Sequence, residues 1–214
     1  MTDRPILFSA PMVRALLDGR KTQTRRILKE QPELFPIDDA GTLCDVGLLH
    51  VQGDPLPRIT LGDGRSGVVT MQQVRFAVGD RLWVKETHTC VGDADRWTLY
   101  RASGYEAECD RHGFDKPYPP ESDVRWKPSI FMPRCRSRLT LIVTDLRVQR
   151  LQDITLGDIC AEGLGSSIYD FKPIQRGFDA WIALWDSING AGAWEANPWV
   201  VTVSFDVIKG NIDG

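Results

Sequence analysis

A polar segment at residues 21–26, with the sequence KTQTRR, carries side chains that could do chemistry. It brings together a lysine amine, two threonine hydroxyls and two guanidinium groups, and it has no apolar side chain to bury. A hydroxyl is a poor nucleophile unless a neighbouring base takes its proton, and an amine can act as that base only when it is neutral. We therefore expect the segment at solvent or beside a cleft. Taken alone, it is more typical of a solvated basic edge than of a catalytic site.

Two further groups of side chains have metal-binding chemistry. His88 and Cys90 are spaced as HxC, and Cys109 and His112 are spaced as CxxH. Two imidazoles and two thiolates could complete a tetrahedral zinc site. The first group falls in a predicted strand and the second in a polar insertion, and scattered reduced cysteines are the commoner explanation. We therefore predict no metal site and no cofactor.

Aromatic and cationic residues could also contact a nucleic-acid base. Trp83, Lys85 and Trp126 could provide stacking and phosphate contacts, because aromatic platforms with interleaved cations suit single strands. Most tryptophans in a domain of this size are core residues, however, and Trp181 and Trp185 are predicted to be structural. The most basic region is residues 134–150, which contains five arginines.

The elements that must position these residues begin at the N-terminal end. Residues 6–8 are predicted to form a short strand, and Ser9 followed by Pro11 marks the start of a helix. Gly19 is expected to end that helix, because glycine readily adopts the left-handed conformation found at helix ends. The polar segment at residues 21–26 follows directly.

Side-chain periodicity predicts the remaining elements. The predicted strands are residues 67–73, 81–87, 97–101, 138–148 and 199–207, and the predicted helices are residues 155–163 and 178–188. Thr155 and Asp158 have the spacing of a capping box. Two polar stretches, residues 30–65 and 103–123, are predicted to be insertions. The pattern predicts an α+β fold, in which a single domain over residues 1–214 forms a mainly antiparallel β-barrel decorated by helices.

The composition excludes several classes of protein. With 42% hydrophobic and 26% charged residues, the 214-residue chain is predicted to be globular rather than disordered or a coiled coil. Its net charge of −3 creates no overall positive field, so any contact with nucleic acid must be local. No apolar run approaches the roughly 18 to 20 residues of a membrane span, and the five scattered cysteines fit reduced thiols. We therefore expect a cytoplasmic protein without a membrane partner.

Three segments together resemble the ASCH family, a branch of the PUA-like superfamily. They are residues 19–26, GRKTQTRR; residues 78–87, VGDRLWVKET; and residues 154–163, which end in AEG. The whole chain is similar to the longer ASCH-like proteins of bacteriophages and prophages, and this similarity includes PSIFMP at 128–133 and LWDSING at 184–190. The first segment alone is weak, whereas the order and spacing of all three are fairly specific.

The resemblance implies a PUA-like barrel with a cleft between the first helix and the sheet, built to hold RNA or a modified nucleoside. Some small ASCH proteins are amidohydrolases that remove the acetyl group from N4-acetylcytidine with a lysine, a threonine three residues later and a glutamate on a later helix. The matching residues, and the expected catalytic ones, are Lys21, Thr24 and Glu162. The expected substrate-binding residues are Arg25, Arg26, Trp83, Lys85 and Trp126. The two predicted insertions are absent from the minimal enzymes.

The resulting hypothesis is that Thr24 attacks an acyl carbonyl, Lys21 accepts its proton, and Glu162 orients the ammonium or activates water. Lys21 must then be tuned by burial or by nearby cations. On a regular strand Lys21 and Thr24 would face opposite sides, so the hypothesis needs a turn near Gly19. The alternative is a non-catalytic RNA- or nucleic-acid-binding module. A third hypothesis is a phage protein whose insertions bind another protein.

Overall fold

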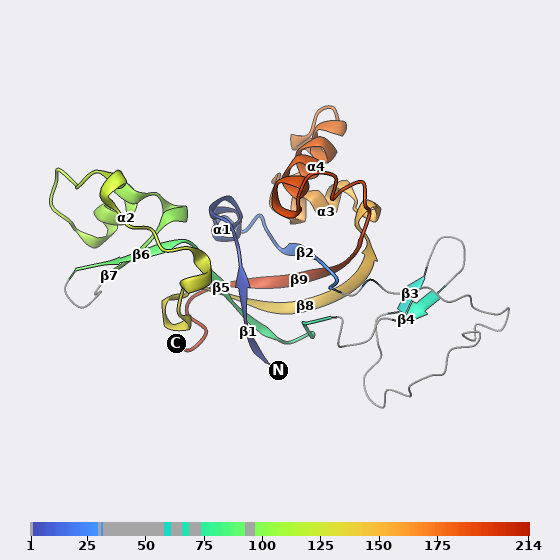
Figure 1. Ribbon diagram of the computed structural model, residues 1–214, viewed down its shortest axis with the longest axis horizontal. Coiled ribbons are helices and arrows are strands. Elements are labelled where there is room, and N and C mark those ends of the chain that lie inside the picture. Colours follow the sequence, from blue (N-terminus) through green and yellow to red (C-terminus); the bar gives the residue numbers. More distant parts are fainter. Residues whose placement is uncertain (1, 30, 32–57, 61–65, 69–73, 93–96) are drawn as a thin grey trace.

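A computed structural model of the chain describes residues 2–29, 31, 58–60, 66–68, 74–92 and 97–214 (Figure 1). Most of the predicted insertion at 30–65, and most of the predicted strand at 67–73, lie outside the described residues. The described part is an α+β fold with a mixed five-stranded sheet, two small two-stranded sheets and four α-helices. The α+β prediction is therefore confirmed.

The central sheet has its strands in the order β1-β5-β8-β9-β2. β1 runs parallel to β5, and each of the other neighbouring pairs in this sheet is antiparallel. The strands are β1 (Asp3–Leu7), β5 (Arg81–Lys85), β8 (Leu139–Arg150), β9 (Trp199–Lys209) and β2 (Gln23–Ile27). The small sheets pair β3 (Arg58–Thr60) with β4 (Ser66–Val68), and β6 (His88–Val91) with β7 (Trp97–Tyr100). The sheet is thus mainly antiparallel, as predicted, with β1 and β2 at its two ends.

Alternation of apolar side chains explains the two long strands at the centre of the sheet. Val203 and Phe205 of β9 and Leu141 and Val143 of β8 all lie in the main core and are at most 2% exposed. Burying each such side chain contributes about 1.5–3 kcal/mol relative to leaving it in water. The strands predicted at 138–148 and 199–207 are confirmed, and each extends by about two residues at its C-terminal end.

The sheet is curved. The pairing of β8 with β9 shifts register between Val143 and Asp145, and an irregularity of this kind bends and twists a strand locally. The two long strands sweep across the molecule in Figure 1. At the ends of the sheet, Arg26 Nη2 on β2 donates a hydrogen bond of 3.0 Å to the carbonyl oxygen of Leu7 on β1. A side chain therefore links the two outermost strands.

Helices cover both faces of β9. α1 (Ala10–Leu17) connects β1 to β2 and adds Val13 and Leu16 to the main core. α3 (Leu156–Ala161) and α4 (Gln175–Asn189) form a second core with Val200. Since Val200 belongs to the second core and Val201 to the main core, and successive side chains of a strand point to opposite faces, the two cores lie on opposite faces of β9.

The helix predicted at residues 178–188 is confirmed as part of α4. Trp181 and Trp185 are buried in the second core, as expected for structural tryptophans. Ile188 departs from the prediction, because it is 60% exposed in the last turn of α4, beyond the second core.

A lobe formed by β6, β7 and α2 (Tyr105–His112) projects from one end of the sheet (Figure 1). The strand predicted at 81–87 is confirmed as β5 but ends two residues early, at Lys85, and the next strand, β6, begins at His88. Between them, the buried Glu86 accepts two hydrogen bonds of 2.8 and 2.9 Å from Arg138. The predicted insertion at 103–123 supplies α2, a helix that the polar composition did not predict.

Gly163, just after α3, provides a test of how closely α3 approaches α1. Its φ is +92°, and a Cβ atom there would lie 2.7 Å from Ala15 Cβ and 3.0 Å from Lys21 Cβ. Gly19 also has a positive φ, +73°, but a Cβ atom there would meet nothing within 4 Å.

We expect Gly163→Ala to lower the free energy of unfolding by roughly 2–5 kcal/mol, because overpacking adds to backbone strain. Gly19→Ala should cost about 1–2 kcal/mol from strain alone. Urea unfolding measures both, and equal losses would contradict the close contact.

Candidate functional site

Lys21 is held between the end of α1, the end of α3 and the start of β2. Its backbone N–H donates to the carbonyl of Ala15 over 3.0 Å, and it forms an isolated antiparallel bridge with Glu162. The next residue, Thr22, donates to the carbonyl of Ala161 over 2.8 Å and accepts from the N–H of Phe205 over 2.9 Å. β2 begins only at Gln23, so strand alternation does not fix the direction of the Lys21 side chain.

The Lys21 ammonium is fully buried and makes three hydrogen bonds. Nζ donates to Glu162 Oε2 over 2.7 Å, to the Gln23 carbonyl over 2.8 Å and to the Glu162 carbonyl over 3.0 Å. An ammonium has three N–H donors, so each has an acceptor. Burial lowers the pKa of Lys21 below its ordinary value, although the adjacent Glu162 carboxylate opposes that change. The structure therefore joins two of the three predicted catalytic residues directly.

Arg25 holds the other oxygen of Glu162. Arg25 Nη1 donates to Glu162 Oε1 over 3.1 Å and to Gln23 Oε1 over 2.8 Å. Its Nη2 lies 3.2 Å from Asp158 Oδ2, close enough for an ion pair, but makes no hydrogen bond in the described structure. Asp158 in turn lies 3.3 Å from Arg147 of β8. The Arg25 side chain is 0% exposed, so it is placed to position Glu162 rather than to meet a ligand at the surface.

Asp158 joins this charge network to the start of α3. The predicted capping box is confirmed: Thr155 Oγ1 accepts from the Asp158 N–H over 3.1 Å, and Asp158 Oδ2 accepts from the Thr155 N–H over 3.0 Å. Partial burial raises the pKa of Asp158, but the hydrogen bonds from Thr155 and the nearby Arg25 and Arg147 outweigh it, so the pKa is lowered overall. The helix that ends at Glu162 is thus anchored through its own cap.

Among the described residues, no hydrogen bond joins Thr24 to Lys21 or Glu162. Within β2 its side chain lies on the face opposite Gln23 and Arg25, because side chains alternate along a strand. Thr24 is only 2% exposed, and its hydroxyl makes no hydrogen bond to any residue that the structure describes. The predicted catalytic hydroxyl is therefore buried near the pair without being joined to it.

The Phe8 ring lies close to two of the cations near the site. The Lys21 Nζ and Arg26 Cζ atoms each lie 5.4 Å from the centre of the Phe8 ring. Arg26 shares its strand face with Thr24 and is half-buried. The cations of Lys21 and Arg26 thus approach the same ring, and Thr24 lies on the same strand face as Arg26.

The other predicted substrate-binding residues lie elsewhere. Trp83 and Lys85 are on the face of β5 opposite the buried Leu82 and Val84, and Lys85 Nζ is 5.2 Å from the centre of a Trp83 ring. Trp126 is half-buried below Arg101, whose Cζ is 5.9 Å from its ring. Within the described chain, the hydrogen bonds, ion pairs and ring contacts of these three side chains do not include the three predicted catalytic residues.

The sequence did not identify the residues that surround Arg25 and Asp158. Gln23 and Asp158, which contact Arg25, and Arg147, which contacts Asp158, were not predicted to belong to the site, although Asp158 was recognised as a helix cap. A usable signal was the spacing of Gln23 and Arg25, which places two polar side chains on one face of a short strand. The acidic residues that pair with Arg25 on that face could not be identified without knowing where α3 lies.

The four residues considered for zinc are not brought together. His112 Nε2 is 3.2 Å from the Thr98 carbonyl oxygen, and its ring stacks on Phe114 at 5.9 Å. Across the residues that the structure describes, no three His, Cys, Asp or Glu side chains are grouped as they would be around a metal ion.

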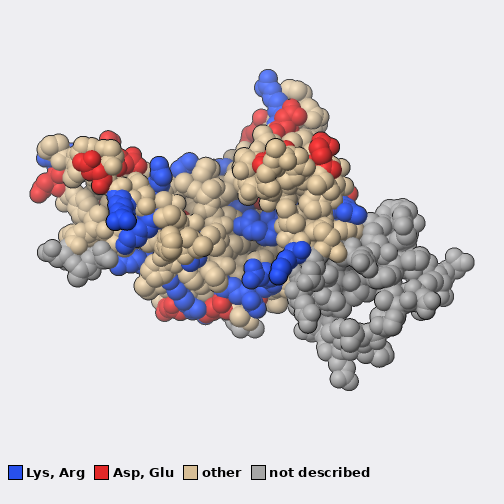
Figure 2. All heavy atoms as spheres, viewed as in Figure 1, with Lys and Arg blue, Asp and Glu red and all other residues tan. Residues whose placement is uncertain are grey.

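Charged side chains of both signs are spread over the visible face. Figure 2 shows lysine and arginine side chains across its middle, and aspartate and glutamate side chains along its lower edge, on the lobe that contains α2 and in the region of α3 and α4. No helix in the described ranges has the length and apolar character needed to cross a membrane.

A cavity of about 1090 Å³ lies in the α2 lobe, lined by residues between 104 and 121, and not at Lys21.

The buried pair predicts strong energetic coupling. We expect Lys21→Met and Glu162→Gln each to lower the free energy of unfolding by roughly 3–5 kcal/mol, because each leaves a buried group without its partner. The double variant should lose less free energy of unfolding than the two single variants lose together, by about 1–3 kcal/mol. Urea unfolding of all four proteins measures this coupling. The exposed pair of Lys116 and Asp110 is the control, for which losses should be additive within error. Additive losses at Lys21 and Glu162 would contradict a direct interaction.

Asp158 predicts a dependence of stability on pH. Its folded-state pKa lies below the ordinary value of 3.8, so the unfolded chain takes up the proton first as the pH falls. The stabilisation from Asp158 is then present above that value and is lost as the pH falls through the folded-state pKa. Compared with wild type, Asp158→Asn should be less stable at neutral pH and lose less free energy of unfolding on acidification below about pH 3.8. Asp206→Asn, at an exposed position of β9, is the control and should follow wild type.

A scan of protein-family models, a search of curated proteins and a search of solved structures found no match to this chain. The resemblance to the ASCH family therefore rests on the sequence segments described above.

Proposed function

We propose that this chain is an ASCH-like, nucleic-acid-associated amidohydrolase that removes the acyl group from N4-acetylcytidine or a related modified nucleoside. The observation that carries the proposal is the buried contact of 2.7 Å between Lys21 Nζ and Glu162 Oε2. It joins two of the three segments that resemble the family, although 141 residues separate them. A bacteriophage or prophage setting comes with the same resemblance, and a cytoplasmic location is expected from the scattered cysteines; both belong to the proposal.

The fold is compatible with a PUA-like barrel. The five-stranded sheet is mainly antiparallel and curved, and Arg26 joins its two outermost strands through the Leu7 carbonyl. The second segment of the resemblance, residues 78–87, includes β5, which pairs with β1 beside that link. These features support a barrel in which β1 and β2, the two outermost strands, are linked by the Arg26 side chain rather than by backbone pairing.

The pair of Lys21 and Glu162 can supply a neutral amine. In a desolvated site, the ion pair competes with a neutral form in which the proton has moved from Nζ to the carboxylate. Burial favours the neutral form of Lys21, and the positive charges of Arg26 and Arg25 act in the same direction. In this form Nζ has a lone pair, and Glu162 holds a proton that can be donated.

The proposed reaction then proceeds in two steps. Thr24 Oγ attacks the acyl carbonyl carbon while its proton moves to Lys21 Nζ, and Glu162 gives its proton to the cytidine nitrogen as the C–N bond breaks. Water next attacks the acyl-threonine ester, one water proton passes to Glu162, and Lys21 returns a proton to Thr24 Oγ as the ester bond breaks. The pair regains its starting protonation, and the products are a carboxylic acid and an amine. The half-buried guanidinium of Arg26 would stabilise the negatively charged oxygen.

Substrate access is a requirement of this proposal. Lys21, Thr24 and Glu162 are each at most 3% exposed. The region between α1 and β2 must therefore open locally when a nucleoside binds, and the Thr24 hydroxyl must approach Nζ. Closure over the substrate would exclude water, which strengthens electrostatic interactions inside the site.

A second candidate function is binding of single-stranded RNA without catalysis. It is favoured by the full use of all three Lys21 donors, which stabilises the ammonium rather than the amine. A separate surface could then hold the bases. Trp83 and Lys85 lie on the outer face of β5, Lys85 Nζ donates to the Ile130 carbonyl, and the neighbouring Phe131 is 70% exposed. Aromatic rings beside a cation suit stacked bases and phosphates.

Thr24→Val tests the catalytic proposal most directly. Valine has nearly the same shape as threonine and suits a buried strand, so we expect the fold to persist while the nucleophile is lost. Release of cytidine from N4-acetylcytidine, as the nucleoside and within a short RNA, is followed by chromatography. We expect wild type to turn over and Thr24→Val to be slower by at least about 10³-fold.

Thr22→Val, at an exposed position of the same segment, is the matched control and should retain turnover. Binding of the same RNA is measured in parallel by fluorescence anisotropy at several salt concentrations. Salt-dependent binding without turnover would contradict catalysis and support the second candidate. Neither binding nor turnover would contradict both, and equal turnover by Thr24→Val would contradict the role of the hydroxyl.

A further inference from the structure

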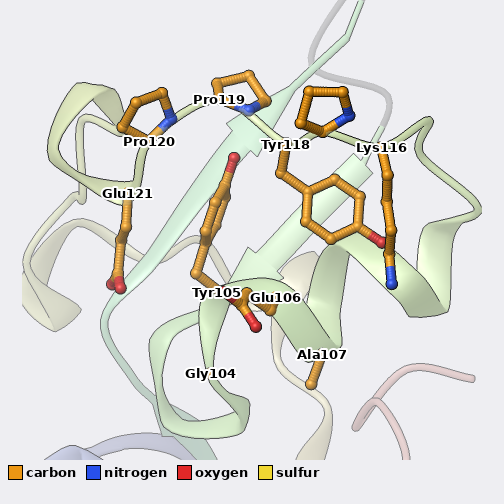
Figure 3. A pocket seen from close by; sticks show the side chains of 10 residues that line it. Gly104, Tyr105, Glu106, Ala107, Lys116, Tyr118, Pro119, Pro120 and Glu121 are labelled. Atoms are coloured by element: carbon orange, nitrogen blue, oxygen red, sulfur yellow. The ribbon is translucent and has the colours of Figure 1, made fainter.

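The cavity of about 1090 Å³ in the α2 lobe is lined by aromatic rings, prolines and charged side chains. Figure 3 shows the ring of Tyr105 standing between Tyr118 and Glu121, with Pro119 and Pro120 along the opposite rim. Tyr105 projects from the first turn of α2, and Tyr118 is held in place because its hydroxyl donates a hydrogen bond to Asp110. Two phenol rings therefore line the cavity, one carried by a helix and the other held by a hydrogen bond.

The lining of the cavity contains more acidic than basic side chains. Two of its residues are acidic, Glu106 and Glu121, and one is basic, Lys116. Lys116, the basic residue of the lining, is already 3.1 Å from Asp110 and lies over the Tyr118 ring at 5.4 Å. Within the described chain, the lining carboxylates Glu106 and Glu121 have no ion-pair partner. An occupant would thus be favoured by positive charge.

Tyr100 of β7, in the same lobe, shows how an arginine binds beside a phenol ring and a carboxylate. The Arg138 guanidinium lies 4.1 Å from the centre of the Tyr100 ring and donates to both oxygens of Glu86 over 2.8 and 2.9 Å. Arg111 approaches the same ring at 5.7 Å and donates to Glu108 over 2.6 Å. A phenol face beside a carboxylate is therefore an arginine-binding arrangement that this chain uses twice, both times at Tyr100 of β7.

We propose that the cavity lined by Tyr105, Tyr118 and Glu121 binds an arginine side chain on an exposed segment of a partner protein. The phenol rings offer faces for the planar guanidinium, and Glu121 offers two oxygens to its parallel N–H groups. Arginine suits this site better than lysine, because its charge is spread over a plane and is less strongly hydrated. Pro119 and Pro120 add rigid apolar surface along the rim for the backbone that carries the arginine.

This site is separate from the amidohydrolase proposal. Its lining lies in the α2 lobe and shares no residue with the network of Lys21, Arg25 and Glu162. Failure of one proposal therefore leaves the other intact. The α2 lobe would serve as an adaptor that brings a protein to the chain.

The test uses the full chain and a capped peptide that contains two arginines separated by one glycine. Binding is measured by titration calorimetry at low salt, against the same peptide with citrulline in place of both arginines and a third with lysine. We expect the arginine peptide to bind most tightly, and Tyr118→Leu and Glu121→Gln each to weaken it by roughly three- to fivefold. Both positions are at the surface of the lobe, so the variants should fold.

Tyr169→Leu and Glu195→Gln are matched controls, because both residues are exposed and lie outside the lobe; neither should change the affinity. Equal binding of the citrulline peptide would contradict recognition of charge, and equal binding of the lysine peptide would contradict recognition of a guanidinium. Unchanged affinity of both lobe variants, or absence of binding at millimolar peptide, would overturn the site. Circular dichroism of each variant confirms that the fold is kept.

Discussion

Burial of the ion pair between Lys21 and Glu162 constrains the positions of three elements that are distant in sequence. Taking two charges out of water costs several kcal/mol per ion, and the cost is offset only when every donor and acceptor is satisfied. Here the start of β2 and the residue after α3 provide those partners, while the Ala15 carbonyl of α1 accepts the backbone N–H of Lys21. Gly163 allows the close approach, and the capping box of α3 fixes the helix that carries Glu162. The same constraints apply whether the pair performs catalysis or only stabilises the fold.

The polar sequence of β2 makes sense only in this setting. β2 is covered on both faces: Lys21 and Arg26 approach Phe8 of the main core, whereas Arg25 lies 5.9 Å from a ring of Trp181 in the second core. Strands buried on both faces are usually apolar, yet this one reads QTRRI. Arg25 is tolerated there because Asp158 of α3 and Glu162 at its end supply acidic partners, so docking of α3 and formation of β2 depend on each other. Removing one partner of such a buried pair is strongly destabilising.

Most of the elements followed from local sequence signals, whereas the partners within the site did not. The alternation in residues 199–207 and the spacing of Thr155 and Asp158 have local causes, so they were predicted correctly. The early end of the strand predicted at 81–87 places Glu86 against Arg138, more than fifty residues away, and the exposure of Ile188 depends on where the second core ends. The resemblance matched Lys21 and Glu162, which the structure joins, but the two roles of Asp158 and the burial of Arg25 needed the tertiary arrangement of α3. Helix α2 was not predicted because its sequence is polar and has no apolar stripe; its buried residues are Glu108, which pairs with Arg111, and Cys109.

The position of β9 has a consequence for how the chain acquires its structure. β9 lies between β8 and β2, although it follows every other strand along the chain. Until it has been synthesised, the growing polypeptide has no partner for β2 and exposes the long edge of β8, and unpaired edges of this kind invite association between chains. Folding of the sheet must therefore wait for pairings of large sequence separation, which are slow to form. A chain shortened before β9 would lose the strand that unites both cores, and it would be a candidate for chaperone binding or proteolysis rather than a smaller version of the same domain.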